Sequence, residues 1–216
     1  MNSEMTMTDG RDPIRMSAGI FLMVMTQLHI EPPSDFTPTI LVVHKDGRRR
    51  IENDREVYEE LHQRFSAEAN VEYYDAGHIS NETLKMKSFK RSCFAGCVER
   101  MARTSVLVTP PGGLAQQVIF LPAGATAIMP NVLLDNLDSA PLDIPDYAHL
   151  EYVHVQRLPV TQQDYARTTD RPLCENTGTP GLHSKLNHCN VRLENLEPLV
   201  ELVKQALHAW RIDHEG

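Results

Sequence analysis

The stretch TILVVH at residues 39–44 decides the fold class. Its apolar run is rich in β-branched residues and does not alternate with polar ones, which is typical of a strand buried on both faces of a parallel sheet. Further short strands are expected at residues 71–74, 105–109 and 125–129. A fifth strand is expected near residues 150–155.

Helices are expected between these strands. Val57, Leu61 and Phe65 recur at intervals of four residues, so they share one face of a helix. A second helix is expected around Cys97, and a third, short one at residues 115–121. A chain that alternates strand and helix in this way predicts an α/β fold, a Rossmann-like parallel sheet with helices on both faces.

The two ends of the chain differ in character. Residues 1–12 are polar and are expected to form a disordered tail, whereas residues 13–216, which begin with a helix at 13–30, are expected to form one lobe. An amphipathic helix capped by Asn195 closes the chain. The residues expected on its buried face are Leu196, Leu199, Val203, Leu207 and Trp210.

Composition excludes several classes of protein. The chain has 216 residues and a net charge of -8, which argues against binding of nucleic acid by general electrostatic attraction. Its longest apolar run, residues 16–28, is shorter than the roughly 20 residues that cross a bilayer, so a buried helix is favoured. The spacing of Cys174, His183, His188 and Cys189 is not a usual one for zinc, and no metal is expected.

A basic loop follows the first strand. It contains His44 and Lys45 and, after a glycine, the consecutive arginines Arg48, Arg49 and Arg50. Arginine side chains and the free N–H groups at the start of a helix both bind phosphate oxygens, so this loop is a candidate site for a diphosphate. A solvated basic turn is the alternative interpretation.

The basic loop ends at a helix start. Asn53 is placed to cap that helix, and Glu56 stands three residues further on, which resembles a capping box. We therefore expect Asn53 to hold the helix N-terminus that faces the diphosphate.

A second loop, rich in glycine, follows the third strand. Pro111, Gly112, Gly113 and Leu114 lead from the strand into the short helix. Glycines after a strand let the backbone approach a ligand closely and leave N–H groups free at the helix start. The loop matches neither GxGxxG nor a P-loop, and a plain tight turn is the alternative interpretation.

Taken together, these segments resemble the C-terminal part of glycosyltransferase family 61, over residues 38–130. In that family the last region commonly reads His-Gly-Ala-Gly-Leu, some apolar residues, and then Phe-x-Pro-x-Gly. Pro111 stands where the family often has His. The matching segments, in chain order, are Arg50-Ile51-x-Asn53, the helix FAGCVERM at 94–101, the glycine-rich loop, and FLPAGAT at 120–126.

The resemblance implies a GT-B-type donor-binding lobe that transfers a sugar from a nucleotide-sugar donor, a UDP-sugar, to a glycan or protein-linked acceptor. It implies no further cofactor. The residues before Thr39 are too few for the acceptor-side lobe, so a missing N-terminal lobe or a partner chain is expected to supply it. The alternative is a non-catalytic module that binds nucleotide sugar or a protein. The compartment stays open: Golgi or ER lumen in a eukaryote, cytoplasm in a bacterium.

Overall fold

The computed structural model describes residues 23, 25–30, 37–46, 50–75, 91–110, 113–130, 153–160, 164 and 190–215. The expected tail at residues 1–12 lies outside these residues. Of the helix expected at 13–30, the structure describes a helical piece at residues 25–28.

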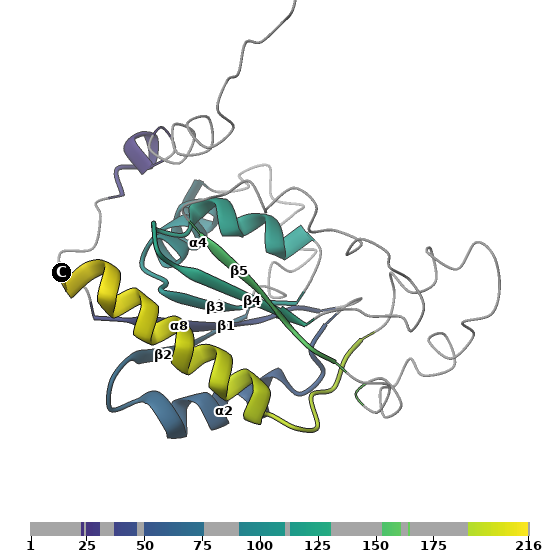
Figure 1. Ribbon diagram of the computed structural model, residues 1–216. Helices are drawn as coiled ribbons and strands as arrows, with labels where there is room; N and C mark the ends of the chain where they lie inside the picture. Colours follow the sequence, from purple (N-terminus) through teal and green to yellow (C-terminus); the bar gives the residue numbers. More distant parts are fainter. Residues whose placement is uncertain are drawn as a thin grey trace, which may run out of the picture.

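A five-stranded, all-parallel sheet forms the centre of the molecule (Figure 1). The spatial order of the strands is β2-β1-β3-β4-β5. Their bounds are β1 (Thr39–His44), β2 (Asn70–Asp75), β3 (Val106–Val108), β4 (Thr126–Pro130) and β5 (His154–Leu158). The expected α/β fold with a Rossmann-like parallel sheet is therefore confirmed.

Side chains of the central strands alternate between two apolar clusters, one on each face of the sheet. On β1, Ile40 and Val42 join one cluster, while Leu41 and Val43 join the other. All four side chains are at most 1% exposed. An apolar side chain is needed at every position because successive residues of a strand point to opposite faces and both faces are covered.

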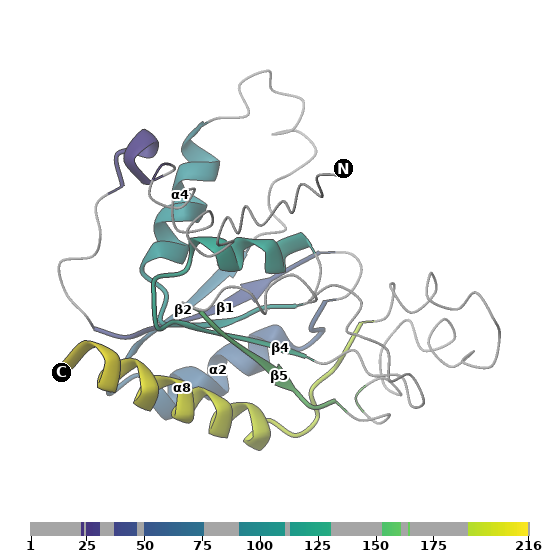
Figure 2. The same cartoon turned by 45° about the horizontal axis from the view of Figure 1, so that its top comes forward.

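Helices cover both faces of the sheet (Figures 1 and 2). The α2 helix (Asp54–Phe65) and the α8 helix (Glu197–Glu215) bury Val57, Leu199 and Val203 against the face of Ile40. The α4 helix (Arg91–Ala102) and the 3-10 helix η1 (Gly113–Phe120) pack on the opposite face. Met25, from the helical piece at residues 25–28, is buried in that second cluster.

The expected faces of α2 and α8 are confirmed by burial. Val57, Leu61 and Phe65 are all buried on α2. On α8, Leu199, Val203, Leu207 and Trp210 are buried, and the expected Leu196 packs partly buried at its start. The Oδ1 atom of Asn195 accepts a hydrogen bond of 3.1 Å from the Glu197 N–H, as expected of a residue that caps this helix.

The fifth strand lies later in the chain than expected. It begins at His154 and ends at Leu158, where it pairs with the last residue of β4. The start of the expected range, residues 150–152, lies outside the described residues. Pairing with β4 from Thr126 to Pro130 sets the extent of β5, and its own burial pattern is mixed, so apolar runs alone located it poorly.

One phrase of the family resemblance has a structural explanation. Gly124 adopts a φ of 80°, a backbone conformation that favours glycine. The Ala125 N–H closes this turn onto the Pro122 carbonyl at 3.1 Å. A Cβ atom at Gly124 would lie 3.1 Å from the side chains of Asp213 and His214. The Pro-x-Gly sequence therefore makes the tight entry into β4 beneath the end of α8.

Among the described residues, no helix combines the length and the apolar character that a membrane span requires.

We expect Leu107→Ala to lower the free energy of unfolding by about 2–5 kcal/mol, because Leu107 is 0% exposed at the centre of the sheet. Urea denaturation followed by circular dichroism measures the loss. Ile212→Ala is the control, since Ile212 is 62% exposed and its truncation should cost within about 0.5 kcal/mol. Equal losses for the two variants would contradict the assignment of the core.

Candidate functional site

The strand order places a topological switch point between β1 and β3. From β1 the chain crosses to β2 on one side, whereas from β3 it crosses to β4 on the other. In open doubly wound sheets, ligands bind in the crevice that forms at the carboxyl ends of such a strand pair. The basic loop follows β1 and the glycine-rich loop follows β3, so the two loops leave neighbouring strands at the same edge.

The structure describes some of the expected site residues at this edge. His44 ends β1, Lys45 follows it, and Arg50 and Asn53 lead into α2. Gly113 and Leu114 open η1. The remaining expected residues, Arg48, Arg49, Pro111 and Gly112, lie outside the described residues.

His44 is held by a carboxylate at the start of α2. Its Nδ1 lies 2.6 Å from Oδ2 of Asp54. An ionised carboxylate only accepts hydrogen bonds, so Nδ1 carries a proton and donates a hydrogen bond to Asp54. The second ring nitrogen, Nε2, lies 3.2 Å from Oδ1 of Asp46. The Asp54 side chain is 7% exposed, the His44 side chain 24% and the Asp46 side chain 66%, so the chain of contacts runs from the interior to the surface.

The buried carboxylate of Asp54 has a second donor. The Tyr73 hydroxyl, from β2, donates to Oδ1 of Asp54 at 3.0 Å. Arg55 lies over the Tyr73 ring, with its guanidinium carbon 4.9 Å from the ring centroid, and the Tyr58 ring meets Tyr73 edge-on at 5.6 Å. Both oxygens of Asp54 are therefore used, and aromatic packing supports the group from the side of β2.

Burial and neighbouring carboxylates together shift the pKa values of His44 and Tyr73. Burial alone would lower the pKa of His44, but the hydrogen bond and charge of Asp54, with contributions from Asp46 and Asp75, raise it above 6.5. Burial is the largest cause of a strongly raised pKa of Tyr73, and the charges of Asp54 and Asp75 add to it. Tyr73 therefore stays a neutral hydrogen-bond donor, while the carboxylates around His44 stabilise its protonated ring and raise its pKa.

Asn53 links α2 to the segment that precedes α8. Its Oδ1 accepts from the Leu193 N–H at 2.9 Å, and its Nδ2 donates to the Leu193 carbonyl at 2.9 Å. Nδ2 also donates to Oε2 of Glu56 at 3.3 Å. The expected capping box is therefore wrong: Asn53 occupies the N-cap position, but its side chain makes no hydrogen bond to the helix N–H groups. The Asn53 amide and Leu193 are 140 residues apart in sequence, and the amide is engaged in this long-range contact.

The same segment fixes Arg50. The backbone of Arg50 accepts from the Val191 N–H at 2.9 Å and donates to Oδ1 of Asn190 at 3.2 Å. Its guanidinium lies 3.8 Å from Oε1 of Glu52, which is long for an ion pair. Within the described part of the chain, the Arg50 Nε is a buried donor with no hydrogen-bond partner. Such a donor fits an acceptor oxygen of a ligand.

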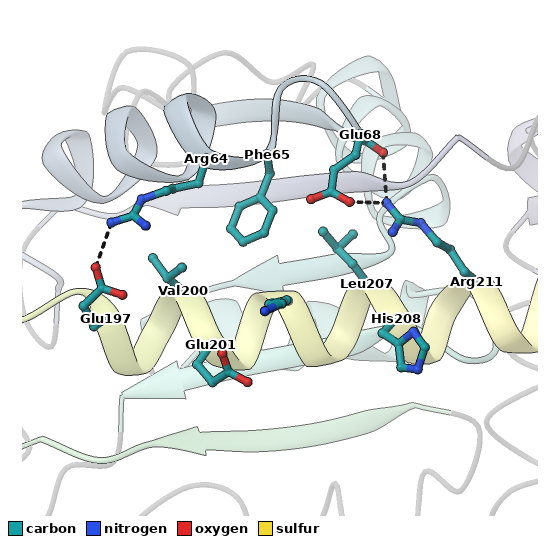
Figure 3. A pocket seen from close by; sticks show the side chains of 10 residues that line it. Arg64, Phe65, Glu68, Glu197, Val200, Glu201, Leu207, His208 and Arg211 are labelled. Atoms are coloured by element: carbon teal, nitrogen blue, oxygen red, sulfur yellow. Dashed lines mark hydrogen bonds and ion pairs between the residues drawn. The ribbon is translucent and has the colours of Figure 1, made fainter.

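A groove of about 470 Å³ lies elsewhere, between α2 and α8 (Figure 3). Its floor is formed by Phe65, Val200 and Leu207, all at most 9% exposed. Ion pairs stand at both ends: Arg64 with Glu197 at 2.7 Å and Arg211 with Glu68 at 2.6 Å. These residues come from the C-terminal end of α2, the turn after it and α8, whereas the basic loop meets the N-terminal end of α2. The groove is thus separate from the switch point.

The described residues hold no group of three or more side chains that could bind a metal ion. Cys97 is a buried free thiol, and burial raises the pKa of that thiol. The side chain of Cys93, like the whole of Cys174 and Cys189, lies outside the described residues.

Sequence reasoning missed the partners of His44. Asp54 stands ten residues after His44 and Tyr73 lies on another strand, so no short motif joins them. A signal was available: a histidine at the end of a buried strand, followed by an acidic residue at the first position of the next helix. In a parallel βαβ unit, those two positions meet at the same edge of the sheet.

Comparisons with known proteins add no identification, because no protein-family model and no curated protein matches the chain.

We expect Asn53→Ala to lower the free energy of unfolding by about 1–3 kcal/mol, because it removes the hydrogen-bond partner of both the buried N–H and the buried carbonyl of Leu193. Urea denaturation measures this loss. Asn70→Ala is the matched control, since Asn70 is exposed at the start of β2. A loss for Asn53→Ala no larger than that for the control would show that the link is unimportant.

The raised pKa of His44 makes its contribution to stability depend on pH. The folded state binds the His44 proton more tightly than the unfolded state, so the contribution is complete below 6.5 and is lost as the pH rises through the folded pKa. The difference in unfolding free energy between wild type and His44→Gln should therefore shrink as the pH rises above 6.5. His208→Gln on the outside of α8 is the control, and an equal trend in that variant would contradict the expectation.

Proposed function

We propose that the chain is the donor-binding lobe of a glycosyltransferase similar to family 61, and that it binds the diphosphate of a nucleotide sugar between the loops that follow β1 and β3. The reaction transfers the sugar of a UDP-sugar to a glycan or protein-linked hydroxyl group. The observation that carries the proposal is the position of the two loops, which leave neighbouring strands at the topological switch point.

The electrostatic demand of this reaction is the charge on the leaving diphosphate. In the proposed site, Arg50 meets that demand, because its buried Nε has no hydrogen-bond partner among the residues that the structure describes and its contact with Glu52 is long. Arg48 and Arg49 belong to the same loop. The start of η1 at Gly113 and Leu114 supplies backbone N–H groups on the other side of the diphosphate.

Lys45 and Asn53 take different parts in this proposal. Lys45 directly follows β1 and adds positive charge at the edge of the sheet. Asn53 acts on the ligand only indirectly, because its amide is engaged by Leu193 and holds the start of α2 in place. The resemblance requires no metal, so the arginines and backbone groups are the proposed counter-charges.

Isothermal titration with UDP and with UDP-sugars tests the proposal. We expect wild type to bind UDP, and Arg50→Ala to weaken binding by about 10- to 100-fold, the effect of losing a charge-assisted hydrogen bond. Arg64→Ala is the control, because it removes the same charge at the far end of α2. Failure of the folded wild type to bind, or equal affinities for wild type and Arg50→Ala, would refute the proposal.

A further inference from the structure

We propose that His44 acts as the general base of the site, with Nε2 accepting a proton from a ligand hydroxyl and Asp54 orienting the ring. This inference rests on the proposed function, and it gives the donor lobe its own proton acceptor. It also changes the role expected for His44, which the basic loop had suggested to be a contact for the diphosphate.

The first ground is the orientation of the ring. Asp54 fixes Nδ1 as the protonated nitrogen, so a neutral His44 carries its lone pair on Nε2. When the ring is protonated, Nε2 donates to Oδ1 of Asp46 at 3.2 Å; that side chain is 66% exposed and belongs to the loop just after β1. A ligand hydroxyl that displaces Asp46 from this position meets Nε2 directly. The arrangement is that of a base oriented by a buried carboxylate.

The second ground is the charge around the ring. His44 is surrounded by Asp46 from its own loop, Asp54 from α2 and Asp75 from the end of β2. Three carboxylates repel a phosphate, but they accept hydrogen bonds from hydroxyl groups. Cations belong to the same region: Lys45 is next in the chain, and the guanidinium of Arg55 lies over the ring of Tyr73. The neutral Tyr73 hydroxyl donates to Asp54 and keeps that carboxylate in position.

The proton transfer is balanced within the proposed reaction. The acceptor oxygen forms a bond to the anomeric carbon while the bond from that carbon to the diphosphate oxygen breaks. The electron pair of the broken bond leaves on the diphosphate, and the hydroxyl proton moves to Nε2 of His44. Asp54 stabilises the resulting imidazolium through the hydrogen bond to Nδ1. Water in place of the acceptor gives hydrolysis of the donor by the same step.

The first test needs no nucleotide. Nitrogen-15 NMR of the whole chain reports the tautomer and the titration of His44. We expect the neutral ring to carry its proton on Nδ1, and Asp54→Asn to lower the pKa of His44. A neutral ring protonated on Nε2, or a pKa unchanged by Asp54→Asn, would overturn the proposal even if UDP binds.

The second test measures release of UDP from a panel of UDP-hexoses, with water as acceptor. We expect His44→Gln to lower the rate by about 100-fold or more, while its affinity for UDP stays within about threefold of wild type (a twofold to threefold change being under 1 kcal/mol). Asp54→Asn should retain part of the rate and shift the acidic limb of the pH profile to lower pH. His208→Gln is the matched control.

The outcomes separate this proposal from the proposed function. A wild type that binds UDP but releases none from UDP-sugars overturns the base while leaving donor binding intact. A His44→Gln variant that loses UDP affinity and rate by equal factors assigns His44 to the diphosphate instead, and also overturns the base. Absence of UDP binding refutes the proposed function, and the tautomer of His44 then decides whether Asp54 orients the ring at all.

Discussion

The Asn53 amide makes two hydrogen bonds of 2.9 Å to the backbone of Leu193, and the geometry of the candidate site depends on them. They join the start of α2 to the segment that leads into α8, the two helices that cover one face of the sheet. The parallel bridge between Ile51 and Val191 extends the junction by two residues. Because Asp54 directly follows Asn53, the junction also sets where its carboxylate lies and hence how His44 is held.

Burial of both sheet faces provides the other half of this geometry. Ile40 and Val42 point toward α2 and α8, so His44, two residues beyond Val42, points the same way. A parallel strand cannot slip by one residue here, since the slip would exchange the two apolar sets between faces. The same alternation on β2 puts Tyr73 on the face of α2. The contact of His44, Asp54 and Tyr73 is thus a consequence of core packing.

The sequence was a good guide wherever burial alone determines structure. The apolar run of β1 and the four-residue spacing of Val57, Leu61 and Phe65 predict elements that the fold contains. It was a poor guide wherever a distant partner decides. Asn53 with Glu56 has the spacing of a capping box, yet the Asn53 side chain pairs with the buried backbone of Leu193 instead of the N–H groups of the helix. The order β2-β1-β3, which locates the switch point, follows from long-range pairing that no local pattern contains.

Two kinds of charge meet at the edge of the sheet, and their separation constrains any ligand. Around His44 the charges are carboxylates, and the guanidinium of Arg50 belongs to the other end of the same loop, beside the segment at Asn190. A ligand with one anionic end and one hydroxylated end suits both the guanidinium and the carboxylates. A simple anion is repelled by Asp46 and Asp75. A simple sugar offers no anionic oxygen to the buried Nε of Arg50, which has no partner among the described residues. Because an unpaired buried donor costs free energy, the ligand that best suits this loop carries both groups at once. The nucleotide sugar that we propose as the ligand has that composition, with a diphosphate at one end and sugar hydroxyl groups at the other.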